Sequence, residues 1–194
     1  MSYLDAHGRY REDHGYPDPG DLADEAAALL AFLERQRATF AWKVGGLDAA
    51  GLRATIGTST MTLGGMLKHL ARFEDDMSSE WLAGKGQVPP WSDVDWDADG
   101  NWDWRTAAED TPEELYGRWR DAVARSRALI AEALGDGDPS QPAKGLTEGH
   151  RETPMIRHVL LNMIEEYARH NGHADLIRES IDGLVGHDPP GGPS

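Results

Sequence analysis

Apolar residues recur every three or four positions in four long segments of the sequence, and this pattern restricts the possible folds. The clearest segment is 62–83, whose apolar side chains are Leu63, Met66, Leu70, Phe73, Met77 and Trp81. This spacing puts all six on one face of an α-helix, whereas a half-buried strand needs a period of two. Residues 21–44, 111–134 and 153–182 follow the same rule, and no segment predicts a strand. We therefore expect an all-α fold.

Capping residues mark the ends of the predicted helices. Thr111 followed by Pro112 and Glu114 is a strong start signal, since Thr can cap, Pro fits the first turn and Glu fits the third position. Thr153 followed by Pro154 predicts a similar start for the last helix. Four long helices joined by two long connections predict a four-helix bundle.

The expected domain organisation is simple. Residues 1–20 are an N-terminal extension, residues 21–183 form the bundle, and residues 184–194 are a disordered tail. Asp21 is expected to cap the first helix, and residues 47–61 to connect it to the second with one short helical turn.

The connection 85–112 contains four Trp among many Asp and several Pro, with no helical or strand period. Loops this long inside a compact domain are usually functional or disordered. Because the Trp side chains need apolar surface to cover, we expect an ordered loop over the bundle. It either closes one end of the core or forms the wall of a binding pocket.

Composition excludes several functions. The chain has 194 residues, no Cys and a net charge of −15. Without Cys there is no disulfide, thiolate metal site or cysteine nucleophile. The negative charge argues against nucleic acid or anionic membrane as a partner. The absence of a secretory signal pattern and of a long apolar run predicts a cytoplasmic protein.

The last predicted helix carries the first candidate site. Its core stripe consists of Ile156, Leu160, Met163, Tyr167, His170, Ala174, Ile177 and Ile181. A histidine thus stands at a core position, with Glu166 one turn before it and His173 on the same side. Buried polar groups need partners. Either Glu166 and His170 form a hydrogen-bonded pair, or they hold a divalent metal.

His69 strengthens the metal interpretation. It lies at the flank of the apolar stripe in the middle of the second long helix, where it can face the last one. His69, Glu166 and His170 would be three protein ligands with one coordination position open, as in catalytic metal sites. His173 is a fourth ligand, a residue that lies behind the ligands or lines the pocket, or a surface residue. His158 and Asn162 either line the mouth of the same cavity or are solvated.

Two stretches make the sequence recognisable: LGGMLKHLARFEDDMSSEW (63–81) and MIEEYARHNGHADLIRESIDG (163–183). The chain resembles the DinB-like superfamily over about residues 20–183, and within it the actinobacterial branch of mycothiol-dependent S-transferases. His69 matches the family's first metal ligand, Glu166 the second and His170 the third. Many relatives have His at the second position, but a His, Glu, His set also occurs among mycothiol-dependent enzymes.

The resemblance implies a fold and a chemistry. It implies an up-down-down-up four-helix bundle, often a homodimer, holding zinc first and nickel as the alternative. The metal would activate mycothiol or a similar low-molecular-weight thiol for attack on an electrophilic small molecule. Trp91, Trp96 and Trp102 would then wall the pocket, and Arg169 and Arg72 could meet anionic groups of the ligand.

Three functions stay open on the sequence. The first is a divalent-metal-dependent thiol S-transferase. The second is a metal-dependent hydrolase, because the same open position can activate water. The third is a non-enzymatic metal- or small-molecule-binding module. Turnover of a thiol, hydrolysis without a thiol, and binding without turnover respectively distinguish them.

Overall fold

The computed structural model describes residues 2–12, 17, 24–135, 138–145, 153–186 and 188–189. Over this part of the chain the elements are the long helices α1 (Glu25–Val44), α3 (Leu63–Asp75), α5 (Pro112–Leu134) and α6 (Ile156–Asp182), and the short helices α2 (Ala49–Arg53) and α4 (Trp102–Thr106). A π-helical segment, η2 (Asp76–Leu82), continues α3, and η3 (Trp91–Asp93) is a single 3₁₀ turn. The same residues contain no strand, only two isolated β-bridges. The predicted all-α bundle is confirmed.

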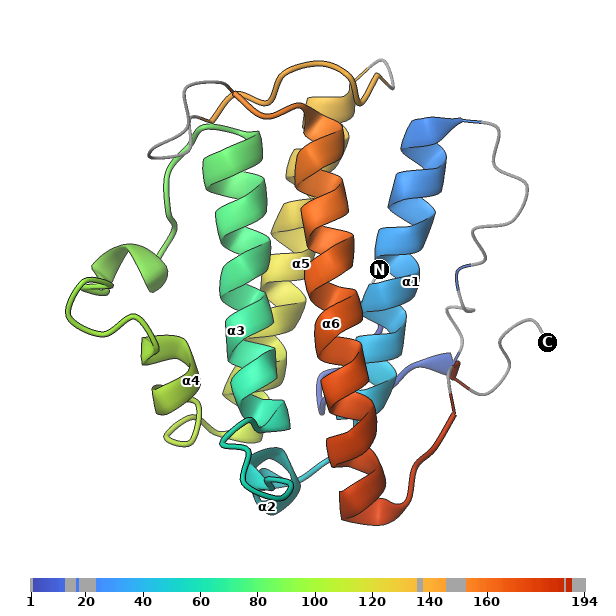
Figure 1. Ribbon diagram of the computed structural model, residues 1–194, viewed down its shortest axis with the longest axis vertical. Helices are drawn as coiled ribbons and strands as arrows, with labels where there is room; N and C mark the ends of the chain where they lie inside the picture. The colour runs from blue at the N-terminus through green and yellow to red at the C-terminus, as the bar shows by residue number, and fades with distance from the viewer. Residues whose placement is uncertain are drawn as a thin grey trace.

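The four long helices form two parallel pairs. Figure 1 shows α1 and α6 running in one direction and α3 and α5 in the other, an up-down-down-up arrangement. α1 packs most extensively on α6, and α3 on α5. Because α3 and α5 are parallel, the chain must return along the bundle between them. The Trp-rich connection makes this return, and α4 lies on the outer side of α3 (Figure 1).

Most helix ends follow the predicted signals. Thr62 caps α3 by accepting a hydrogen bond from the Gly65 amide, and Thr111 and Glu114 form the expected capping box of α5. α1 starts after Asp24, whose side chain accepts from two backbone amides. The predicted cap Asp21 lies outside the described residues.

The last helix starts two residues later than the predicted Pro154. α6 begins at Ile156, after Met155, and has no side-chain cap. Residues 153–155 are instead tied to the preceding connection. The Ala143 amide donates to the Pro154 carbonyl at 2.8 Å, and the Ile156 amide donates to the Gln141 carbonyl at 2.9 Å. These bonds hold the Thr-Pro segment in an extended form, so tertiary pairing outweighs the local capping preference.

The apolar stripe of α3 does not continue unchanged into η2. Met66 and Leu70 are fully buried, but Phe73 and Trp81 are only partly buried. Polar side chains take the buried positions instead: Glu74, Asp75, Ser78 and Ser79. The Ser78 hydroxyl donates to the Glu74 carbonyl at 2.7 Å, the kind of bond that disturbs regular α-helical pairing. The sequence pattern predicts one continuous apolar stripe from Leu63 to Trp81, and the structure departs from it after Leu70.

A buried polar network takes the place of apolar packing at this point and joins all four long helices. Arg37 of α1 donates through Nε to Glu74 of α3 at 2.7 Å, and both side chains are at most 1% exposed. The Tyr167 hydroxyl of α6 donates to the same carboxylate at 2.7 Å, and Trp119 of α5 donates to that hydroxyl at 2.8 Å. Burying these charges is tolerable because each has a partner.

The Trp-rich connection 85–112, called the crossover segment from here on, is ordered, as predicted, and lies along α3 rather than over an end of the bundle. Trp91 is fully buried and donates from Nε1 to Asp75 at 2.9 Å. Lys68 forms an ion pair with Asp110 at 2.6 Å and lies 4.4 Å from the Trp102 ring centroid. Helix α4 was not predicted, since five residues are too few to show a helical period. No helix in the described ranges has the length and apolarity required to cross a membrane.

Candidate metal centre

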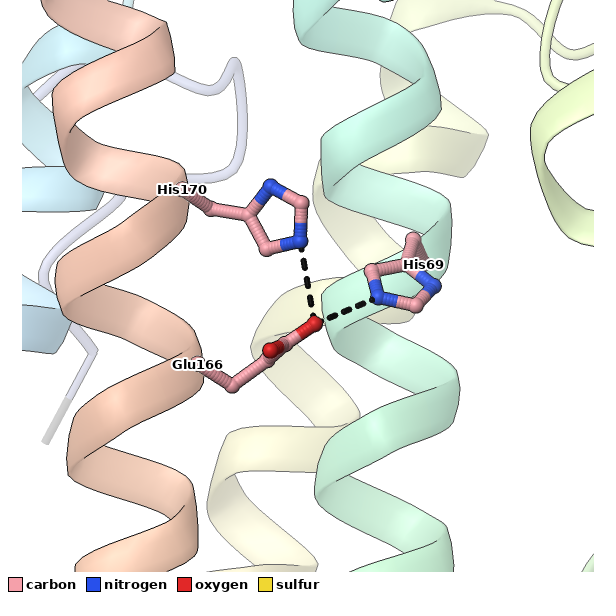
Figure 2. A group of neighbouring side chains, drawn as sticks. All are labelled: His69, Glu166 and His170. Atoms are coloured by element: carbon pink, nitrogen blue, oxygen red, sulfur yellow. Dashed lines mark hydrogen bonds and ion pairs between the residues drawn. The ribbon is translucent and has the colours of Figure 1, made fainter.

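The structure brings the three predicted ligands together where α3 faces α6. His69 projects from α3, and Glu166 and His170 project from successive turns of α6 (Figure 2). One ligand atom from each lies within 4.8 Å of the others. His69 Nε2 and His170 Nε2 are each 3.1 Å from the same oxygen, Glu166 Oε1.

Helical geometry explains this convergence. Glu166 and His170 are four residues apart, so their side chains lie one above the other on α6. His170 occupies a core position of the helix and its side chain is 5% exposed, whereas those of Glu166 and His69 are 18% and 20% exposed. The site is therefore anchored in the core and open on one side.

The crossover segment contacts His69 from behind. Asp103 of α4 lies with Oδ2 at 2.9 Å from His69 Nδ1, and its side chain is 1% exposed. The adjacent Trp104 stacks on the His69 ring with the centroids 4.7 Å apart, and lies 5.6 Å from the ring of His170. Neither Asp103 nor Trp104 was selected from the sequence. A partner carboxylate behind a metal-binding His is a common arrangement, but six Asp lie between residues 93 and 110 and the pattern does not distinguish them.

The charges in the site are unevenly distributed. Burial disfavours the charged form of His69, but hydrogen bonds to Asp103 and Glu166 outweigh it and raise the pKa of this ring. Burial, together with the charge of His69, lowers the pKa of His170 to about 4. The hydrogen bond from His69 lowers the pKa of Glu166 to about 2. Without a metal, the two carboxylates therefore favour a proton on His69, and burial favours a neutral His170.

These residues fit a divalent cation. Two imidazole nitrogens and one carboxylate oxygen are a ligand set found in catalytic zinc sites. When His69 Nδ1 carries a hydrogen and donates to Asp103, the Nε2 lone pair faces Glu166 Oε1. Two electron-rich atoms facing each other require a positive charge between them, which either a proton or a metal ion supplies.

The other α6 residues proposed for the pocket are placed differently. The His173 ring lies 5.6 Å from that of His170, close enough to border the site. Arg169 is exposed and lies 3.7 Å from Glu166 Oε2. His158 is exposed and Asn162 half-buried, on turns that precede Glu166. A pocket role for these side chains stays a prediction.

The residues proposed from the crossover side form a layer over α3. Arg72 lies 3.5 Å from the Trp96 ring centroid and forms an ion pair with Asp76 at 3.1 Å, so other groups already engage its charge. Trp96 and Trp102 pack edge to face at 6.3 Å. Trp104, by contrast, touches both histidines of the site.

Two cavities lie against Trp104. One has a volume of about 280 Å³ and is lined in part by Leu52, Thr62 and Leu115. The other, of about 460 Å³, is lined in part by Met61. Both include Trp104 and Arg105 in their walls. Trp104 therefore contacts the two histidine rings and also lines space large enough for small molecules.

The sequence was compared with protein families and with curated proteins. No curated protein matches the chain significantly. A family model described as mycothiol-S-transferase matches residues 28–183, which include His69, Glu166 and His170. This range runs from the first turns of α1 to the glycine that ends α6, and covers most of the chain. The chain therefore belongs to the mycothiol-S-transferase family, a DinB-like family of helical bundles.

Proposed function

We propose that the protein is a divalent-metal-dependent transferase that uses mycothiol, or a similar low-molecular-weight thiol, to attack an electrophilic small molecule. The observation that carries the proposal is the convergence of His69, Glu166 and His170, whose ligand atoms lie within 4.8 Å of one another in a member of this family. Three protein ligands leave a coordination position for a cosubstrate.

The chemistry follows from the ligand set and from the composition. A divalent cation in this site would act as a Lewis acid and lower the pKa of a coordinated thiol. The thiol must come from a bound molecule, because the chain has no Cys. Imidazole ligands suit both zinc and nickel; we propose zinc first.

The protein residues prepare the site for that cation. Glu166 is ionised at neutral pH, since its pKa is lowered to about 2, and it supplies one negative charge. His170 is neutral, since its pKa is lowered to about 4, and offers a lone pair. Trp104 covers one side of both rings and limits access of water there.

The cavities beside Trp104 support a small-molecule substrate. The smaller one combines apolar side chains such as Leu52 and Leu115 with hydroxyl and guanidinium groups such as Thr62 and Arg53. Ligand pockets are typically apolar with a few polar groups that orient the ligand. We place the electrophile or part of the thiol cosubstrate here.

The first experiment measures bound metal and thiol transfer together. We expect untagged wild-type protein to hold about one zinc or nickel per chain by mass spectrometry. We also expect it to conjugate mycothiol to a reactive fluorogenic electrophile, with activity lost on chelation. His170→Ala should lose both properties. His7→Ala, which removes an exposed histidine of the N-terminal segment, should retain both.

Other results would favour the alternatives. Hydrolysis of an ester or amide substrate without added thiol would support a metal-dependent hydrolase. Metal and thiol binding without turnover would support a binding module. Wild-type protein without metal after reconstitution would contradict the proposal. A homodimer in the cytoplasm is part of the proposal, and light scattering of the purified protein tests the dimer.

A further inference from the structure

We propose that Asp103 is a positioning residue for the metal site: it holds His69 in the tautomer whose Nε2 lone pair points to Glu166 and His170. This inference rests on the proposed metal-dependent function. Asp103 belongs to the crossover segment and contacts His69, but neither Glu166 nor His170.

The geometry of Asp103 suits this role. Its Oδ2 is 2.9 Å from His69 Nδ1. Its Oδ1 accepts a hydrogen bond from the backbone amide of Trp104 at 3.0 Å, and this bond holds the carboxylate in one orientation. The side chain is 1% exposed, so water does not compete for the bond to His69.

The guanidinium of Arg72 lies near Asp103 but does not compete with His69 for its carboxylate. Arg72 Nη1 lies 3.6 Å from Asp103 Oδ2, beyond normal hydrogen-bond length. The same guanidinium donates through Nε to Asp76 at 3.1 Å and stacks on Trp96. The short contact of Asp103 is therefore the one to His69.

Without Asp103, the site has a competing arrangement. A neutral imidazole carries one hydrogen, on either Nδ1 or Nε2. With the hydrogen on Nε2, His69 would donate to Glu166 Oε1, which lies only 3.1 Å away. That arrangement satisfies Glu166 but places a proton where the metal should bind. Asp103 and Glu166 can both only accept, but Asp103 lies nearer to its nitrogen, at 2.9 Å against 3.1 Å, and is less exposed, at 1% against 18%. Asp103 therefore stabilises the other tautomer, with the hydrogen on Nδ1.

Trp104 completes the restraint on the His69 ring. Its indole stacks on the ring at a centroid distance of 4.7 Å and an interplanar angle of 27°. The hydrogen bond at one edge and the indole on one face together restrict rotation of the imidazole. Two consecutive residues of α4 therefore fix both the tautomer and the plane of a ligand that belongs to α3.

The test is zinc affinity of Asp103→Asn, measured by competition with a chelating indicator. The amide has nearly the same shape but lacks the negative charge, and its NH₂ group can donate to Nδ1 and favour the wrong tautomer. We expect zinc binding to weaken by about 10- to 100-fold. Asp103→Glu, which keeps the charge, should recover part of the affinity.

Asp99→Asn is the matched control. Asp99 belongs to the same crossover segment and pairs with Arg105 at 2.6 Å, away from the ligands. Its substitution should leave zinc affinity within about twofold of wild type, as for surface changes away from the site. A similar loss in both variants would show that the affinity reports only disturbance of the segment.

A tautomer measurement separates positioning from a structural role. Nitrogen-15 NMR of the metal-free protein, above the pH at which His69 loses its charge, should show hydrogen on Nδ1 in wild type and on Nε2 in Asp103→Asn. An unchanged tautomer, or unchanged zinc affinity, would overturn the role of Asp103. Wild-type protein that binds no zinc at all would overturn the proposed function as well.

Discussion

Single residues decide how closely the crossover segment approaches the site, and Gly65 is the clearest case. A Cβ atom at this position would lie 2.7 Å from Trp104 Cε3, a distance that real Cβ contacts avoid. Gly65 is inside α3, where glycine is otherwise unfavourable by up to about 1 kcal/mol. The missing side chain lets Trp104 reach His69.

We predict that Gly65→Ala weakens zinc binding and lowers thermal stability. The indole is rigid and would have to shift, which disturbs its stacking on His69. Gly172→Ala is the matched control, since a Cβ there meets nothing within 4 Å and the residue is exposed in α6. The control should gain about 0.5–1 kcal/mol from helix propensity. Denaturant unfolding measures the stability of both variants, and zinc titration measures their affinity.

An equal gain in stability for Gly65→Ala and Gly172→Ala would contradict a clash between the new Cβ and Trp104.

The sequence predicts the three proposed ligands but not the residues that contact His69 from the crossover segment. His69, Glu166 and His170 follow from helical spacing, since a histidine in a core stripe and a carboxylate four residues away must share one face. Asp103 and Trp104 do not follow, because the connection that carries them has no helical or strand period to show which of its side chains face His69. Their contact depends on the path of this connection, which no local pattern encodes.

Helices α1 and α5 belong to different pairs, and a cluster of charged side chains joins them. Glu34 of α1 accepts from Arg127 of α5 and from Arg37 of its own helix, the latter at 2.7 Å. Burial raises the cost of its charge, but the two guanidinium groups outweigh this and lower the pKa of Glu34 to about 2. The ionised carboxylate therefore stabilises the contact between α1 and α5.

The sign of the pH dependence follows from that shift. A carboxylate whose pKa is lower in the folded state contributes stability above the unfolded value near 4.5 and loses it as pH falls toward 2. We predict that Glu34→Gln reduces the free energy of unfolding by about 2 kcal/mol at pH 7, with a difference that shrinks below pH 4.

Urea unfolding of wild type and variant across pH 3–7 measures this difference. Glu132→Gln is the control, because that carboxylate is 56% exposed and its ion pair with Lys85 is 3.5 Å long. Exposed pairs of this kind contribute little. A Glu34→Gln difference that stays constant with pH would show that packing, rather than charge, explains the effect.

The elements themselves were largely predictable, and the exceptions have physical causes. α5 matched its predicted bounds because Thr111 and Glu114 cap it locally. The start of α6 did not, since backbone pairing with residues 139–143 holds the preceding segment extended. The π-helical turn η2 also escaped prediction, because it accompanies buried polar contacts made across helices.

The candidate metal site spans the two helix pairs of the bundle. α3 belongs to one pair and α6 to the other, and His69 faces Glu166 and His170 across the seam between them. The Arg37–Glu74–Tyr167 network crosses the same seam. Polar groups thus join the pairs beside the apolar core, and a cation in the triad would add a direct link.

We predict that zinc stabilises the whole bundle. A ligand that binds only the folded chain adds about 2.7 kcal/mol at 100 times its dissociation constant, which corresponds to roughly 5–10 °C for a domain of this size. Thermal unfolding of chelated and zinc-loaded wild type should therefore differ by that amount. Magnesium should have little effect, since it prefers oxygen ligands.

In His170→Ala, which lacks one of the three ligand side chains, zinc should leave the midpoint of thermal unfolding nearly unchanged. An equal rise in this variant would place the stabilising zinc elsewhere, for instance among surface carboxylates, and the triad would then not be the link between the two helix pairs.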